Sequence, residues 1–205
     1  MLIKTIPVGQ LETNCYIVTD EATLKCAVID PGDEASVILN YIESSNLTVE
    51  AIFLTHGHHD HWLGLDGVRE GTGAPAYVNK ADSFPASGRG SHMMFPADED
   101  IKYYEDGDVI KVGNLEFKVL ATPGHSRGSV TLICEDAMFS GDTLFRDSCG
   151  RTDFEGGDMA TILKSLLRLS NLEGDYEVYP GHMGSTTLSR ERSFNYYMNY
   201  AKNNG

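Results

Sequence analysis

A short apolar run that leads directly into a cluster of histidines is the feature that most constrains how this chain can fold. Residues 51–54 have the continuous apolar pattern of a strand covered on both faces. The segment HGHHDH (residues 56–61) follows at once and places five ionisable side chains within six residues. Because ordering so many imidazole and carboxylate groups is costly without a partner, this segment predicts a metal site rather than a solvated loop.

Three further segments place a potential ligand at the end of a strand, beside glycine and other turn-forming residues. They are TPGHS with His125, SGDT with Asp142 and YPGH with His182. Glycine lets the backbone turn sharply and approach closely. A lone histidine or a lone Ser-Gly-Asp is more often an ordinary residue than a ligand. The same pattern of strand, turn and ligand occurs four times in this chain, however, and this repetition indicates one common site.

Imidazole and carboxylate side chains in this arrangement suit a pair of divalent metal ions. These groups are the ligands of zinc and related ions, and the HxHxDH spacing supplies two pairs that could serve two adjacent metals. We therefore predict two divalent ions, with Zn²⁺ favoured and Fe or Mn as alternatives. His59 is the spare histidine of the motif, and neither it nor His92 is expected to bind metal.

The first half of the chain alternates short strands and helices. Strands are predicted over residues 2–6, 15–19, 26–29 and 74–78. A helix is predicted over residues 34–45, where apolar residues fall at helical spacing after a turn, and Asp33 is its predicted N-cap. A second helix begins near Trp62. Residues 82–100 are rich in Gly, Ser, Pro and acidic residues without a clear period, which predicts a long loop.

The second half repeats this plan. Strands are predicted over residues 109–112, 115–121, 129–134 and 137–140. Two amphipathic helices follow. The first is capped by Asp158 and carries Met159, Ile162, Leu163, Leu166 and Leu167 on one face, and the second carries Phe194, Tyr197, Met198 and Ala201. Strand groups followed by amphipathic helices predict two packed sheets with helices outside them, and periodicity leaves α/β and α+β open.

Length, charge and composition exclude several classes of protein. A chain of 205 residues is long for a minimal domain and short for two, so we predict a single domain over residues 1–205. A formal charge of −14 without a basic patch argues against nucleic acid and anionic membranes as partners. No apolar run reaches the roughly 18 residues that span a bilayer. A small molecule is the expected partner, and the oligomeric state stays open.

Cysteine usage and the N-terminus bear on location. The first residues lack the apolar core of a signal peptide. The four cysteines have no CxxC spacing, which favours reduced thiols over a disulfide framework. We therefore expect a cytoplasmic protein.

The segments THGHHDH, TPGHS, SGDT and YPGH, in this order over nearly the whole chain, resemble the metallo-β-lactamase superfamily. The resemblance implies an α/β (α+β) fold, a four-layer αββα sandwich of two mixed sheets packed together with helices outside. It also implies a site for two metal ions that share seven ligands. These are His56, His58 and His125 around one ion, Asp60, His61 and His182 around the other, and Asp142 as the bridge.

Within that superfamily, residues 141–158 with their GRTDF segment resemble the glyoxalase II-like hydrolases and the related persulfide dioxygenases. Residues 180–192 are similar to the short glyoxalase II-like proteins. Arg151 and Asp153 are read either as groups near the metal pocket or, with more weight, as a structural ion pair. Cys149 either approaches the site as a thiol or, with more weight, fills space in the packing. Few residues follow His182, so the glutathione-binding residues of full-length glyoxalase II cannot be carried over.

The function implied by the resemblance is hydrolysis of an acyl-thiol, such as a hydroxyacyl-glutathione, through a metal-bound hydroxide. Two divalent ions about 3.5 Å apart lower the pKa of a bridging water while one of them polarises the carbonyl. Asp60 or Asp142 can orient the hydroxide and take its proton, which makes these two the candidate catalytic residues.

Two alternatives remain beside this hydrolase. One is a mononuclear iron persulfide dioxygenase that uses His56, His125 and Asp142. The other is a non-catalytic metal-binding module, which is disfavoured because no expected ligand is missing. A β-lactamase is disfavoured by the lack of an export signal, and a nuclease by the acidity of the chain.

Overall fold

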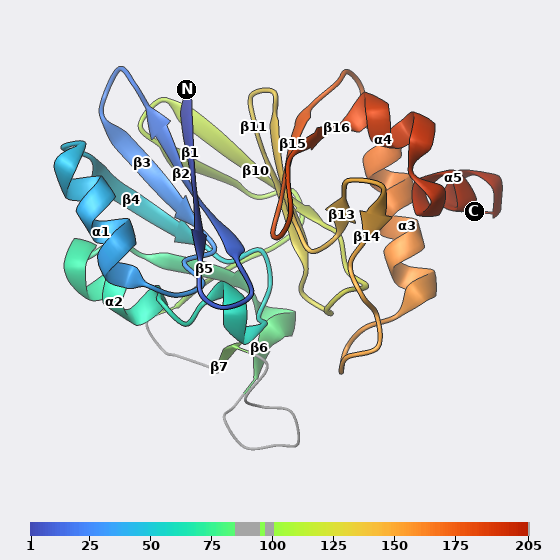
Figure 1. The fold of residues 1–205 in the computed structure, drawn as a ribbon, viewed down its shortest axis with the longest axis horizontal. Helices are drawn as coiled ribbons and strands as arrows, with labels where there is room; N and C mark the ends of the chain where they lie inside the picture. Colours follow the sequence, from blue (N-terminus) through green and yellow to red (C-terminus); the bar gives the residue numbers. More distant parts are fainter. Residues whose placement is uncertain (85–94, 97–100, 205) are drawn as a thin grey trace.

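The computed structural model describes residues 1–84, 95–96 and 101–204. Most of the loop predicted over residues 82–100 lies outside the described residues, and so does His92. The described parts of the chain form two six-stranded sheets that face each other, with helices on both outer sides (Figure 1).

The first sheet is mixed and comes from the N-terminal half of the chain. Its strands are, in spatial order, β1 (Leu2–Val8), β2 (Thr13–Asp20), β3 (Lys25–Ile29), β4 (Thr48–Phe53), β5 (Ala76–Asn79) and β8 (Lys102–Tyr104). Strands β1, β2 and β3 pair antiparallel, whereas β3, β4, β5 and β8 pair parallel. Parallel neighbours need crossover connections, and helices α1 (Ala35–Ser44) and α2 (Leu65–Thr72) lie in two of them.

The second sheet is also mixed and comes from the C-terminal half. Its strands are, in spatial order, β16 (Thr186–Thr187), β15 (Glu177–Pro180), β12 (Ala137–Gly141), β11 (Val130–Cys134), β10 (Leu115–Ala121) and β9 (Val109–Val112). All neighbours pair antiparallel except β12 and β15, which are parallel. Helix α3 (Met159–Ser170) lies in the crossover between β12 and β15, and α4 (Leu188–Phe194) and α5 (Tyr196–Asn204) follow the sheet.

Shorter elements fill the connections near the edge where β4 and β12 end. Two single-turn 3₁₀ helices span His59–His61 and Lys80–Asp82. Strands β6 (Ser83–Phe84) and β7 (Phe95–Pro96) pair with each other, and β13 (Leu144–Phe145) and β14 (Ser148–Cys149) form a small hairpin.

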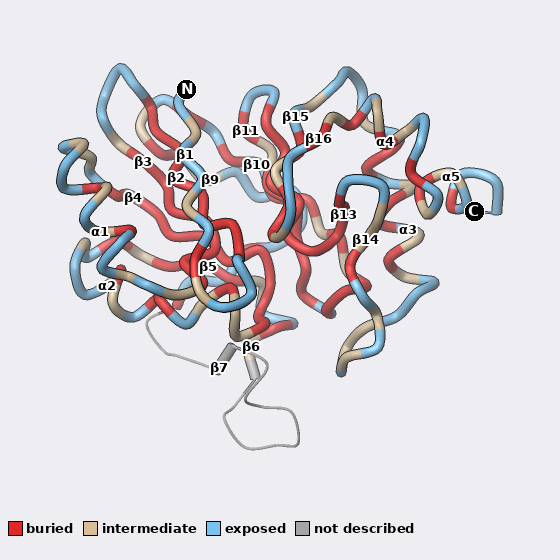
Figure 2. The backbone as a smooth tube through the Cα atoms, in the orientation of Figure 1, coloured by how far each residue is buried: buried red, intermediate tan, exposed pale blue. Residues whose placement is uncertain are grey.

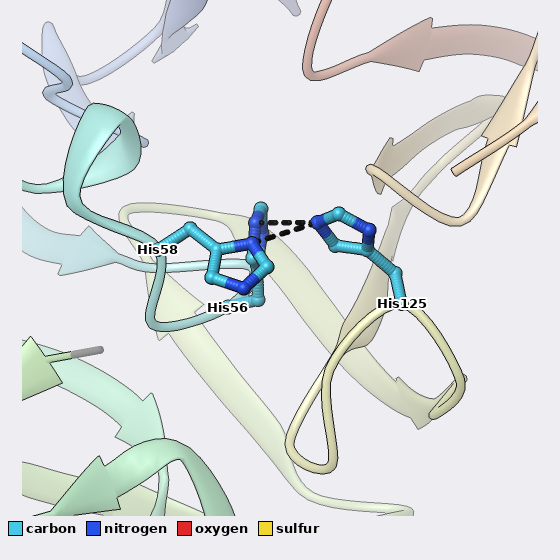
Figure 3. Close-up of side chains that lie close together, drawn as sticks. All are labelled: His56, His58 and His125. Carbon is cyan, nitrogen blue, oxygen red and sulfur yellow. Dashed lines mark hydrogen bonds between the residues drawn. The ribbon is translucent and has the colours of Figure 1, made fainter. Parts of the chain in front are cut away.

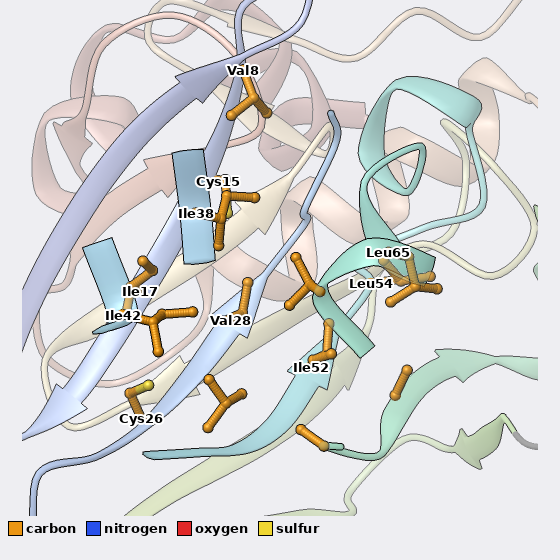
Figure 4. Packing of buried hydrophobic residues seen from close by; sticks show 14 of the residues in the cluster. Val8, Cys15, Ile17, Cys26, Val28, Ile38, Ile42, Ile52, Leu54 and Leu65 are labelled. Carbon is orange, nitrogen blue, oxygen red and sulfur yellow. The ribbon is translucent and has the colours of Figure 1, made fainter. Parts of the chain in front are cut away.

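Alternating side chains along the strands of the first sheet divide between two hydrophobic cores. In β2, Tyr16 and Val18 belong to the core between the sheets, whereas Cys15 and Ile17 belong to the core on the outer face. This division follows from the two-residue period of a strand. The helices complete the outer core with Ile38 and Ile42 of α1 and Leu65 and Val68 of α2 (Figure 4).

The strands of the second sheet divide in the same way. Phe117 of β10 belongs to the core between the sheets, where its ring centroid lies 5.1 Å from that of Phe53 in β4. Met138 of β12 belongs to a third core, which α3, α4 and α5 cover. The buried backbone accordingly runs through both sheets, and exposed residues mark the outer helices and turns (Figure 2). The predicted αββα sandwich of two mixed sheets is therefore confirmed.

The predicted N-cap of the first helix is wrong. Helix α1 begins at Ala35, and no side chain caps it. Glu34 precedes the helix in a left-handed conformation with φ 48°, and the Asp33 carboxylate accepts a hydrogen bond from the adjacent Glu34 N–H at 2.7 Å. This local bond turns the Asp33 side chain away from the free N–H groups of the first turn.

The predicted C-terminal helix is two helices. Asn195 interrupts it in an extended conformation, because its buried side chain donates to the carbonyl of Ser148 at 2.9 Å and to the Glu191 carboxylate at 3.0 Å. The break turns Phe194 outward, where it is 71% exposed. The prediction that Phe194 lies on the buried face is therefore wrong, and Met159 of α3 is likewise exposed.

Over the described ranges, the structure holds no helix with the length and apolar character needed to cross a membrane.

Candidate metal centre

The structure brings all seven predicted ligands together at one edge of the sandwich. Four strand ends meet there: those of β4 in the first sheet and of β10, β12 and β15 in the second. The last three strands run in one direction, because β11 is antiparallel to both β10 and β12, and β12 is parallel to β15. The residues that follow these four strands are His56, His58, Asp60 and His61, then His125, then Asp142, and then His182.

Three buried histidines form one group of the cluster (Figure 3). His56, His58 and His125 are each at most 3% exposed. His125 Nε2 lies 2.8 Å from His58 Nδ1 and 3.2 Å from His56 Nε2. Side chains from two different sheets therefore converge on one point, which is the arrangement predicted for a first metal ion.

A second group contains the fully buried His61 together with Asp60 and His182, which are partly exposed. His61 Nε2 and His182 Nε2 lie 3.7 Å and 3.2 Å from Asp60 Oδ2. Asp142 stands between the two groups, with Oδ2 3.5 Å from His125 Nε2 and Oδ1 3.5 Å from His61 Nε2. Asp142 Oδ2 also lies 3.6 Å from His182 Nε2, so this carboxylate lies close to both groups, as expected of a bridging ligand.

The polar atoms of the cluster lack the partners that burial normally demands. His61 Nε2 and Asp142 Oδ1 are both buried without a hydrogen-bond partner. Three overlapping sets of donor atoms, each set within 4.8 Å, are built from the seven predicted ligands. Buried unpaired polar atoms are costly, and a cation among these nitrogens and oxygens would remove that cost. The donor set thus fits divalent metal ions.

Three of the histidine ligands have a partner on the ring nitrogen that faces away from the cluster, whereas His58 Nε2 is buried without one. The pairs are His61 Nδ1 with Asp30 Oδ2 at 2.9 Å, His125 Nδ1 with the Arg151 carbonyl at 2.8 Å, and His182 Nδ1 with the Leu11 carbonyl at 3.1 Å. A carbonyl oxygen only accepts, so His125 and His182 donate from Nδ1 and turn the lone pair of Nε2 toward the cluster. Such partners orient and tune metal ligands.

Burial and neighbouring charges shift the pKa values of the ligands in opposite directions. Burial, helped by the surrounding imidazoles, lowers the pKa of His58 to about 4 and that of His56 well below its usual value. Burial also lowers the pKa of His61, but the carboxylates of Asp30 and Asp142 outweigh it and raise the value to about 9. His56 and His58 are therefore neutral at neutral pH, as metal ligands must be.

A cavity of about 500 Å³ opens onto this cluster. Five of the predicted ligands line it, and its apolar wall consists of Leu11, Phe145 and Phe154. Arg151 also lines the cavity and makes two hydrogen bonds of 2.7 Å to the Asp153 carboxylate. Its guanidinium lies 3.8 Å from the centre of the Phe154 ring. The ion pair is present, and Arg151 also lies beside the metal pocket, so the structure agrees with both interpretations of these residues.

Two residues of the motif-bearing segments stay apart from the cluster. Cys149 packs against the third hydrophobic core, and burial raises the pKa of its thiol to about 11, which supports the packing role. His59 lines the cavity but belongs to none of the three donor sets among the described residues.

Sequence reasoning missed the residues that support the ligands. Asp30 belongs to the turn predicted before the first helix, yet it is 1% exposed and accepts hydrogen bonds from the backbone and the hydroxyl of Thr55 at 2.7 Å each. The Thr55 hydroxyl lies 3.1 Å from His56 Nδ1. The one sequence signal of Asp30, which was not used in predicting the site, is its place directly after a strand, a position that the predicted ligands share.

An αββα sandwich with clustered imidazoles and carboxylates at one edge defines a class of metallo-hydrolases. The family model described as "Metallo-beta-lactamase superfamily" matches residues 8–182. The chain therefore belongs to the metallo-beta-lactamase superfamily, and its histidine and aspartate clusters imply that it binds divalent metal.

Curated relatives match over nearly the full length of both chains. An uncharacterized protein of Aquifex aeolicus is 40% identical over 95% of this chain and 96% of its own length. A probable metallo-hydrolase, YqgX, of Bacillus subtilis is 37% identical over 96% of this chain and 97% of its own. Hydroxyacylglutathione hydrolase GloC of Haemophilus influenzae is 31% identical over 97% of this chain and 99% of its own length.

Solved structures give the same fold. The B3 metallo-beta-lactamase BLEG-1 superimposes with a TM-score of 0.85 at 32% identity, over 96% of this chain and 99% of the other. ETHE1 from Myxococcus xanthus superimposes with a TM-score of 0.83 at 29% identity, over 99% of this chain and 91% of the other. TTHA1623 in a di-iron-bound form superimposes with a TM-score of 0.81 at 32% identity, over 95% of this chain and 99% of the other.

Proposed function

We propose that this protein hydrolyses thioesters of small acyl-thiols, such as a hydroxyacyl-glutathione, at a two-metal centre with the seven ligands predicted above. The observation that carries the proposal is the convergence of seven imidazole and carboxylate donors, five of which line an open cavity. The relationship to the protein named hydroxyacylglutathione hydrolase GloC supports the choice of substrate.

Bound divalent ions would supply a Lewis acid for the thioester carbonyl oxygen and would lower the pKa of water enough for attack near neutral pH. The histidines hold their lone pairs toward the centre through the partners of their other nitrogens. Water adds to the carbonyl carbon, the carbon–sulfur bond breaks, and the products are a carboxylic acid and a thiol. A thiolate leaves easily, so no buried acid is required to protonate it.

Asp60 orients the attacking water. Burial raises its pKa, but the His182 hydrogen bond and the charges of His61 and His182 outweigh that effect and hold the pKa below its usual range. Asp60 is thus ionised at neutral pH and accepts a hydrogen bond from water. Leu11, Phe145 and Phe154 form the apolar wall of the cavity, where they contact the substrate and exclude bulk water.

A second candidate is the mononuclear iron persulfide dioxygenase. Two histidines and one carboxylate on a common face form the donor set of non-haem iron oxygenases. His125 provides it together with His56 Nε2 at 3.2 Å and Asp142 Oδ2 at 3.5 Å. The likeness to TTHA1623 in its di-iron-bound form keeps iron among the candidate metals.

The test is thiol release from S-lactoylglutathione by protein of known metal content, with an oxygen electrode on glutathione persulfide in parallel. Metal-dependent thiol release without oxygen uptake supports the thioesterase. Oxygen uptake with persulfide instead supports the dioxygenase. Turnover of neither compound by metal-loaded protein contradicts both substrate assignments and would mean a hydrolase of another substrate or the non-catalytic module. A chromogenic β-lactam serves as the comparison substrate.

The matched variants are His58→Ala and His59→Ala. Both remove an imidazole from the same motif, but only His58 belongs to a donor set. His58→Ala should lose metal and thiol release together, whereas His59→Ala should keep its metal content.

A further inference from the structure

One buried carboxylate connects the loops that carry the three histidines. Asp82 ends the 3₁₀ helix Lys80–Asp82 and is fully buried. Its Oδ2 accepts hydrogen bonds from the Gly57 N–H at 2.9 Å and from the Ser126 hydroxyl at 2.6 Å. Its Oδ1 accepts from the Gly128 N–H at 2.6 Å. No sequence motif pointed to this residue.

The partners of Asp82 are neighbours of the predicted ligands. Gly57 lies between His56 and His58 in the loop after β4, and Ser126 directly follows His125 in the loop after β10. A single side chain thereby ties a ligand loop of the first sheet to a ligand loop of the second.

The contact around Asp82 is tight and specific. A Cβ atom on Gly128 would lie 2.7 Å from Asp82 Cγ, so the backbone approaches the carboxylate as closely as glycine allows. Ser126 is held a second time by Ser129, through hydroxyl groups 2.6 Å apart. Two of the three donors are backbone N–H groups, which cannot accept a hydrogen bond.

We propose that Asp82 is a positioning residue that sets the separation of His56 and His58 from His125, and so preforms the trihistidine site before metal arrives. The proposal rests on the metal centre of the proposed function. It predicts that Asp82 governs metal affinity without contacting the ion. Residues that support metal ligands through hydrogen bonds, without contacting the ion, typically change metal affinity by about 10- to 100-fold when they are removed.

The test is a Co²⁺ titration of chelator-treated protein, followed by visible absorption, for the wild type and Asp82→Asn. An asparagine presents an amide NH₂ to one of the backbone N–H groups, so at least one of these hydrogen bonds is lost. We expect Asp82→Asn to bind the ion with the trihistidine ligands about 10- to 100-fold more weakly and with an altered Co²⁺ spectrum.

Asp20 provides a matched control. It is 6% exposed and accepts hydrogen bonds from the N–H groups of Ala22 and Asn114, at 3.0 and 2.9 Å, and from the Thr23 hydroxyl at 2.6 Å. It therefore has the same kinds of partner as Asp82. Asp20 ends β2, about 23 Å along the strand from Thr13 at the metal edge. Asp20→Asn should lower the unfolding temperature but leave the Co²⁺ affinity and spectrum unchanged.

The outcomes separate this proposal from the one it rests on. If wild-type protein binds no Co²⁺, the metal centre itself is wrong. If the wild type binds Co²⁺ and Asp82→Asn binds it equally well with the same spectrum, Asp82 has only a structural role and the positioning proposal is overturned. Should Asp82→Asn not fold, Ser126→Ala removes one of the three hydrogen bonds and must still weaken Co²⁺ binding relative to Asp20→Asn.

Discussion

Metal removal should lower the stability of this protein by an amount that the structure bounds. His61 Nε2 and Asp142 Oδ1 are buried without partners, and each unsatisfied atom costs about 1–3 kcal/mol. A bound ion that satisfies both would therefore recover about 2–6 kcal/mol of native-state free energy. By mass action, free metal at 100 times its Kd adds about 2.7 kcal/mol, within that range. For a chain of this length the corresponding rise in Tm is roughly 5–11 °C.

The assay is differential scanning calorimetry of chelator-treated protein with increasing Zn²⁺ or Mn²⁺, for the wild type, His125→Ala and His59→Ala. His125 belongs to the trihistidine group and lies 3.5 Å from Asp142 Oδ2, so its loss should reduce the metal-dependent rise in Tm. His59→Ala should keep the full rise. A rise of wild-type size in His125→Ala would place the ion elsewhere, and no rise in the wild type would refute the argument from the unpaired atoms.

Three other substitutions test the packing and the site. Gly181→Ala would place a methyl group 2.2 Å from the carboxylate of the predicted bridging ligand, so metal content by mass spectrometry should fall, whereas Gly184→Ala meets nothing within 4 Å and should load normally. Phe117→Ala in the core between the sheets should lower the free energy of unfolding, measured in urea, by about 3–5 kcal/mol. Phe194→Ala at an exposed position should lower it by about 0.5 kcal/mol or less. Asp158→Ala removes the N-cap of α3 and should cost about 0.5–2 kcal/mol in the same assay, and no loss would contradict the assigned cap.

Several strands were predicted to the residue or nearly so. Residues 109–112 and 115–121 are β9 and β10 as predicted, because their alternating or apolar patterns end at glycine and turn residues. Short strands such as β13 and β16 were not predicted, since two residues carry no period. The C-terminal residues were predicted to form a single helix because the spacing of their apolar residues is helical throughout. That spacing carries no information about the hydrogen bond from Asn195 to Ser148, 47 residues away in the chain, which accompanies the break.

The candidate ligands were also accessible from sequence, since each stands at a strand end beside a turn. Sequence could not place Asp30 or Asp82 in the site. Both are aspartates in turn-like segments, and their partners lie in loops at least 25 residues away.

The sequence by itself determined which chemical groups were present and where along each strand they fell. Residue type and a two-residue or 3.6-residue period are local properties, and they sufficed for two sheets with outer helices, while the resemblance to the superfamily implied the set of seven ligands. The tertiary structure decided how those groups face one another. Distances such as the 2.8 Å between His58 and His125 depend on how one sheet lies against the other. That arrangement is set by the packing of Phe53 on Phe117 and by hydrogen bonds such as those of Asp82, which join residues that no local pattern relates.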